Sequence, residues 1–189
     1  MFAILAKSIG LSLYCMLSGS IYSKIVKYRF NHSTSQLCTI SIFGMFFLGL
    51  ISLLLNFFFP LSLLINNVVL FLILIISFIY KSIKIDIKVI KFSLIIGFIS
   101  FILICLSNIN RPDAGLYHYP FISLLNDNKI IIGVTNLHTR FGLTSIIQYI
   151  SALNYNSVFG LNGIVIPLAT LASLIFLYFF SEIINFYKS

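Results

Sequence analysis

Polar side chains able to do chemistry are scarce in this sequence, and most of them lie between Asn108 and Arg140. This segment holds two of the four acidic residues, two of the three histidines and two of the three arginines. Ionisable groups gathered at one membrane face indicate a functional site. Carboxylate and imidazole groups can move protons, and guanidinium groups bind phosphate in a forked geometry. The candidate site residues are Arg111, Asp113, Tyr117, His118, His138 and Arg140.

The same residues also have structural interpretations, which stay open at this point. Asn110 can cap a helix and Pro112 suits its first position, so Asp113 also fits the first turn, where the helix dipole favours a carboxylate. Each histidine, taken singly, also fits an interfacial position. Pro120 predicts a kink, and Phe121–Leu125 predicts a short helix at the membrane surface.

The elements that must position this segment are membrane spans. Hydrophobic residues make up 60% of the chain and charged residues 8%, against roughly 25% in soluble domains. The composition therefore predicts an all-α, polytopic transmembrane bundle in the cell (inner) membrane. We expect about five spans, at Phe2–Tyr22, Thr39–Phe59, Leu61–Tyr80, Val89–Leu106 and Val158–Phe180. Asn66, Asn67 and Asn162 in these spans are expected to hydrogen-bond across helices.

The distribution of positive charge predicts the topology. The connections after the first and third spans carry three and four Lys or Arg residues, which places both on the cytoplasmic side. The net charge of +8 therefore reflects membrane topology and does not indicate a nucleic-acid partner. The predicted organisation is four spans in residues 1–107, an extracytoplasmic loop in 108–157, and a final span with a cytoplasmic tail in 158–189. Within the loop, Phe141–Tyr155 is about 22 Å long as a helix, too short to span, and predicts a surface-lying or re-entrant helix.

Two strings in the loop carry a resemblance to a known type of protein. Residues 113–118 (DAGLYH) and 133–142 (GVTNLHTRFG) resemble a paired motif in an uncharacterised family of bacterial polytopic membrane proteins. That family is similar to GT-C glycosyltransferases, which use lipid-linked sugars and carry an acid in a large extracytoplasmic loop. GT-C members usually have more spans, and their acid commonly follows the first helix. The chain is therefore expected to be a truncated product, a fragment or a subunit completed by a partner.

The resemblance implies a role for each candidate residue. Asp113 would deprotonate an acceptor hydroxyl, and Arg140 or Arg111 would neutralise the phosphate of a polyprenyl-phosphate sugar donor. His118 and His138 would polarise the phosphate or, with Asp113, hold a divalent metal, for which the spacing is not diagnostic. Tyr117 would stack on a sugar. The partners implied are membrane lipid and the sugar donor. The alternatives are a non-catalytic membrane subunit of a cell-envelope polysaccharide assembly system and, more weakly, a small transporter.

The predicted topology can be tested by labelling a cysteine placed at Ala114. We expect a thiol reagent that cannot cross the bilayer to label this cysteine in intact cells, because the loop should face outward. Labelling that occurs only after permeabilisation would place the loop in the cytoplasm and remove the basis for an extracytoplasmic site.

Overall fold

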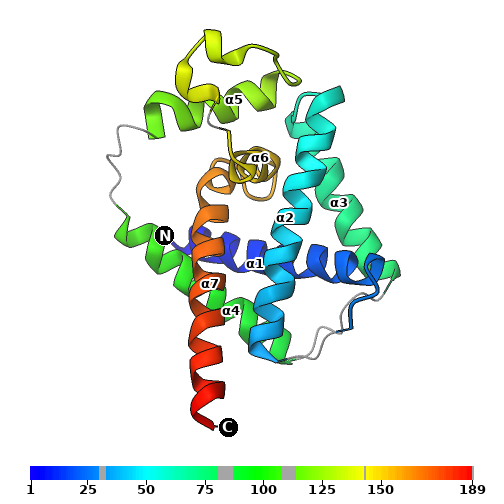
Figure 1. Cartoon of the computed structure of the whole chain (residues 1–189), viewed down its shortest axis with the longest axis vertical. Coiled ribbons are helices and arrows are strands. Elements are labelled where there is room, and N and C mark those ends of the chain that lie inside the picture. Colours follow the sequence, from blue (N-terminus) through cyan, green and yellow to red (C-terminus); the bar gives the residue numbers. More distant parts are fainter. Residues whose placement is uncertain (30–32, 81–86, 108–113, 143, 189) are drawn as a thin grey trace.

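The protein is a bundle of α-helices, described by a computed structural model over residues 1–29, 33–80, 87–107, 114–142 and 144–188 (Figure 1). Every regular element in these ranges is helical, which confirms the predicted all-α class. Four helices there are long and apolar enough to cross a membrane. They are α1 (Phe2–Ile25), α2 (Thr34–Phe58), α4 (Ile87–Leu106) and α7 (Asn162–Lys188).

The third predicted span is a shorter helix, α3 (Leu63–Ile79), of 17 residues. At 1.5 Å per residue it is about 25 Å long, slightly less than a hydrocarbon core of about 30 Å. It starts later than expected because Leu61 belongs to a turn, in which its backbone N–H donates to the carbonyl of Leu125 at 2.9 Å. The described bundle therefore contains four long apolar helices and one shorter one.

The end of α1 and the end of α3 lie side by side, at the right of Figure 1. The Lys24 side chain, at the end of α1, donates a hydrogen bond to the carbonyl of Tyr80, which follows α3. The short helices α5 (Tyr119–Asp127) and α6 (Ile146–Leu153) lie above α1, towards the top of Figure 1. Helix α1 runs across the bundle, and the predicted alternation of spans and the side of the membrane on which each loop lies stay predictions.

Helix α1 crosses α2 at a steep angle, and two glycines allow the backbones to touch (Figure 1). A Cβ at Gly19 would lie 1.9 Å from the carbonyl oxygen of Ile40, and one at Gly44 would lie 1.9 Å from that of Cys15. Real Cβ atoms do not approach backbone this closely, so any larger residue must push the helices apart. Membrane helices use small residues at such crossings because close packing, not exclusion from water, holds them together.

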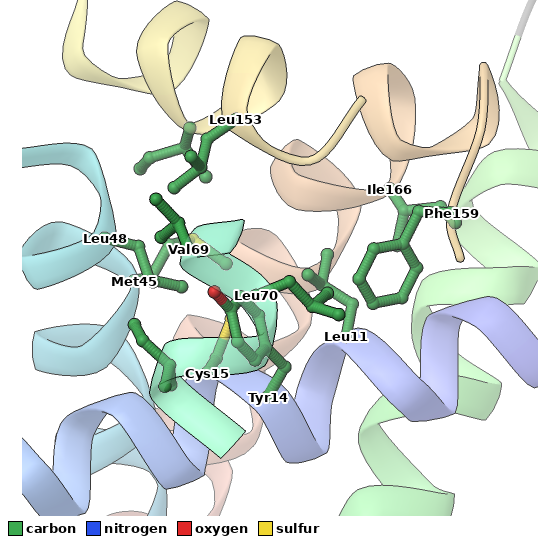
Figure 2. Packing of buried hydrophobic residues seen from close by; sticks show 12 residues of the cluster. Leu11, Tyr14, Cys15, Met45, Leu48, Val69, Leu70, Leu153, Phe159 and Ile166 are labelled. Atoms are coloured by element: carbon green, nitrogen blue, oxygen red, sulfur yellow. The ribbon is translucent and has the colours of Figure 1, made fainter. Parts of the chain in front are cut away.

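Side chains from five helices meet above this crossing and form the main core (Figure 2). Leu11 and Tyr14 of α1 pack with Leu48 of α2, Leu70 of α3 and Ile166 of α7. Leu153 of α6 joins the same cluster. The short helix α6 is thus part of the core and not an appendage of it.

The glycine crossing predicts that Gly19→Ala destabilises the fold. Separating α1 from α2 should cost about 1–3 kcal/mol and lower the Tm of the detergent-purified protein by on the order of 5 °C. The matched control is Gly10→Ala on the same helix, where the new Cβ would lie 3.6 Å from Phe159, an ordinary contact. Equal melting temperatures for the two variants would show that the crossing is not close.

Candidate functional site

From residue 114 on, the predicted site segment folds into short helical pieces at the top of Figure 1. Residues Ala114–His118 form a single π-helical turn, η1, and α5 begins directly after it with Pro120 in its first turn. The expected short helix at Phe121–Leu125 is confirmed as part of α5. Its Phe121 and Leu125 side chains are buried against the bundle. Arg111 and Asp113 lie outside the residues that the structure describes.

Tyr117 is the centre of a small cluster of candidate residues. The guanidinium carbon of Arg140, from the short helix η3 (Thr139–Gly142), lies 4.9 Å from the centroid of the Tyr117 ring. The His118 ring lies 4.3 Å from the same Tyr117 ring, centroid to centroid. A cation over an exposed aromatic ring contributes about 0.5–1 kcal/mol. The structure therefore brings together residues from the two strings singled out in the sequence, across 22 intervening positions.

His138, on the second string (133–142), contacts its own sequence neighbours Arg140 and Phe141. Its Nδ1 accepts a hydrogen bond from the backbone N–H of Arg140 at 3.2 Å, and its ring lies 5.3 Å from that of Phe141. Among the described residues, no three His, Cys, Asp or Glu side chains gather closely enough to hold a metal ion. A divalent metal shared by His118, His138 and Asp113 stays a prediction, since Asp113 is not among them.

His118 has a polar contact that the sequence reasoning missed. Its Nδ1 lies 3.4 Å from Nε2 of Gln148, a buried side chain on α6. Gln148 in turn accepts a hydrogen bond at Oε1 from the backbone N–H of Ser145, at 2.9 Å. A Ser-x-x-Gln spacing at a helix start is a capping-box signal, and it could have singled out Gln148 from the sequence.

Helix α6, which supports Gln148, is buried along most of its length. Every residue from Gln148 to Leu153 is less than a tenth exposed. The hydroxyl of Ser52 on α2 donates to the carbonyl of Tyr149 at 2.8 Å, and Gly49 leaves room for Ile146 and Ile150. Helix α6 is thus packed inside the protein, and its surface-lying or re-entrant position in the membrane stays a prediction.

Two buried asparagines donate hydrogen bonds to the carbonyl groups at the ends of these short helices. Nδ2 of Asn66, on α3, lies 2.8 Å from the Ala152 carbonyl and 2.7 Å from that of Tyr155, both at the end of α6. Nδ2 of Asn56, on α2, lies 3.2 Å from the carbonyl of Leu125 and 3.0 Å from that of Asn128, at the end of α5. The last carbonyls of a helix have no partner within it, so these contacts act as caps from neighbouring helices.

Bonding across helices was expected for the asparagines in the predicted spans. Asn66 confirms it through its contact with Ala152 of α6, whereas Asn67 exchanges two hydrogen bonds with Ser157 in the turn before α7, at 2.8 and 2.9 Å. For Asn162, at the start of α7, the structure does not test the expectation.

A half-open cavity of about 240 Å³, with both polar and apolar groups in its lining, lies between α5, residues 129–134, η3 and the start of α6. Phe121, Phe141 and Tyr149 form part of its wall, and Lys129 and Thr144 add polar groups. Burial raises the pKa of the Tyr149 phenol above its usual value, so this hydroxyl stays protonated at neutral pH. The cavity suits an apolar or amphipathic group.

The fold and this end region define a multi-pass helical membrane protein. The whole chain, residues 1–189, matches one family model and so belongs to the family described as Domain of unknown function (DUF8201). No curated protein and no solved structure matches the chain.

The asparagine caps predict that Asn66→Leu destabilises α6. It should leave the Tyr155 carbonyl without its side-chain donor in an apolar environment, at a cost of about 1–3 kcal/mol. Hydrogen exchange of the amides at residues 150–156 should then become faster. Asn67→Leu is the matched control because the partner of Asn67 among the described residues is Ser157, at a more exposed edge, where a smaller effect is expected. If both variants accelerate exchange equally, Asn66 is not the specific cap of α6.

Proposed function

We propose that this protein is a glycosyltransferase-like protein of the inner membrane. In this proposal it transfers a sugar from a polyprenyl-phosphate donor to an acceptor hydroxyl at the extracytoplasmic face, alone or as part of a larger assembly. The observation that carries the proposal is the cluster of Arg140, Tyr117 and His118, because it joins an anion-binding group and a ring that could stack on a sugar. The resemblance of the two strings to the loop of GT-C enzymes supports the same reaction class.

The chemistry assigns one role to each group. The acceptor hydroxyl oxygen attacks the anomeric carbon of the sugar, and its proton passes to the carboxylate of Asp113. The bond between the anomeric carbon and the phosphate oxygen breaks, and the polyprenyl phosphate leaves with the electron pair. Arg140 binds this phosphate in the proposal, because the forked N–H donors of a guanidinium match the oxygens of a phosphate. Arg111 and His138 are further donors for the phosphate in this proposal.

The neighbouring cavity supports an amphipathic substrate. It lies beside Phe141, whose ring contacts both His138 and Phe121, at ring distances of 5.3 and 5.6 Å. A ligand with an anionic head at Arg140 would thus have an apolar wall within reach. A transporter is less well supported, because the polar side chains Asn66 and Asn67 are engaged in hydrogen bonds that hold the fold together.

The test of this function is Asp113→Asn, which removes the proposed base. In membrane vesicles supplied with radiolabelled polyprenyl-phosphate sugars, the variant should lose sugar transfer while its abundance in the membrane is unchanged. Asp127→Asn is the matched control, since Asp127 is exposed and bonds only to Ser123 among the described residues, at 3.2 Å. It should keep its transfer activity.

Two results would contradict the proposal. Equal transfer by wild type and Asp113→Asn would exclude the carboxylate as the base. Absence of transfer by the wild-type protein would favour the alternative, a non-catalytic membrane subunit of a cell-envelope polysaccharide assembly system.

A further inference from the structure

The contact between Gln148 and His118 has a fixed direction. The backbone nitrogen of Ser145 can only donate, so the atom of the Gln148 amide that faces it, at 2.9 Å, must be the oxygen. The amide nitrogen of Gln148 then points to Nδ1 of His118, at 3.4 Å. An amide nitrogen is a donor only, and Nδ1 must therefore offer a lone pair. In the neutral ring this places the proton on Nε2.

From this geometry we infer that Gln148 is a positioning residue, which holds His118 in the Nε2–H tautomer. The tautomer follows from the geometry alone. The role of His118 rests on the proposed function, in which its Nε2–H donates a hydrogen bond to an oxygen of the donor phosphate or sugar. In this state His118 is a hydrogen-bond donor and not a base, which leaves proton removal to Asp113.

The surroundings of Gln148 explain why this support is rigid. Gln148 is 6% exposed and lies on α6, whose residues are buried from Gln148 to Leu153. Its amide could swap its two ends only by turning the NH₂ group towards the Ser145 N–H, which would place two donors against each other. A buried donor without an acceptor costs about 1–3 kcal/mol. His118 is exposed, so its orientation depends on this buried partner.

The second histidine shows the same arrangement with a different donor. Nδ1 of His138 accepts from the backbone N–H of Arg140, which again assigns the proton of the neutral ring to Nε2. Both histidines therefore present an N–H group away from their protein partners. Two such donors near Arg140 would suit a ligand rich in oxygen acceptors, such as a sugar phosphate.

This geometry also argues against His118 as a metal ligand. A histidine that binds a metal through one nitrogen usually donates its other N–H to a carbonyl or carboxylate acceptor. Here the partner of Nδ1 is a donor, fixed in that orientation by Ser145. Binding of a metal at Nε2 would move the ring proton to Nδ1, against the Gln148 N–H. The divalent metal considered from the sequence is therefore not expected at His118.

The experiment reads the tautomer directly and needs no transfer activity. The full chain is labelled with ¹⁵N-histidine in lipid nanodiscs, and the His118 signals are assigned by their loss in His118→Asn. At a pH where the ring is neutral, the wild type should show Nε2–H at His118. Because neutral imidazole favours this form in water as well, the variants decide the question.

Gln148→Glu is the decisive variant. Its carboxylate can still accept from the Ser145 N–H but presents an acceptor to His118, so Nδ1 should become protonated in the major form. Gln36→Glu, which adds the same charge on α2, is the matched control and should leave His118 unchanged. Gln148→Met removes the donor without adding charge, and it should raise the Nδ1–H population above that of the wild type.

The outcomes separate this inference from the proposed function. An unchanged His118 tautomer in Gln148→Glu, or in Gln148→Met where the Glu variant does not fold, overturns the role of Gln148. So does Nδ1–H in the wild type. A switch of tautomer in Gln148→Glu together with no transfer by the wild type would retain the positioning role and reject the glycosyltransferase.

Discussion

The last carbonyl groups of a short helix inside an apolar bundle lack hydrogen-bond donors. Much of this structure depends on the side chains that donate to these carbonyl groups. A helix of eight or nine residues leaves its last carbonyls unpaired, and lipid offers no water to satisfy them. Asn66 supplies the end of α6, and Asn56 supplies the end of α5. Both asparagines are fully buried. Through these hydrogen bonds the two side chains tie the ends of α5 and α6 to the long helices α2 and α3.

The long helices provide the frame into which α6 fits. The glycine contacts of Gly19 and Gly44 let α1 cross close to α2. From that crossing α1 runs back to the α6–α7 connection, where the Lys7 ammonium donates to the carbonyl of Phe159 at 2.8 Å. Lys7 lies near the start of α1, where a lysine side chain can reach the membrane interface. Its hydrogen bond to Phe159 also fixes the connection between α6 and α7 to α1.

The candidate site consists of polar groups on short turns, and the buried helix α6 supports them. Tyr117, His118 and Arg140 lie on short turns that have little packing of their own. Gln148 reaches His118 from α6, and Phe121 and Phe141 anchor the turns on either side. A binding site needs its contact residues fixed by groups behind them. Here that support comes from a helix that the bundle itself encloses, which connects the core to the proposed chemistry.

The sequence by itself determined the class of fold and the region of interest. Long apolar runs predicted the helices, since only helices and closed barrels satisfy their backbones in lipid. The rarity of charged residues made the cluster in 108–140 stand out. The short helix at Phe121–Leu125 was also predictable, whereas Pro120, at which a kink was expected, lies in the first turn of that helix.

The contacts between segments distant in the sequence were decided only by the tertiary structure. The length of Phe141–Tyr155 excluded a comfortable span but did not show that α6 would be buried, because a short helix of mixed apolar and polar residues suits either the surface or the interior of a protein. Burial of α6 depends on Gly49 and Ser52 of α2 and on Asn66 of α3, which no local pattern connects to it. The pairing of Gln148 with His118 is of the same kind, since the sequence carries no signal of a contact between residues 30 positions apart. Periodicity and composition indicate whether a residue needs an apolar or a polar environment. Which residue provides that environment is determined by tertiary packing.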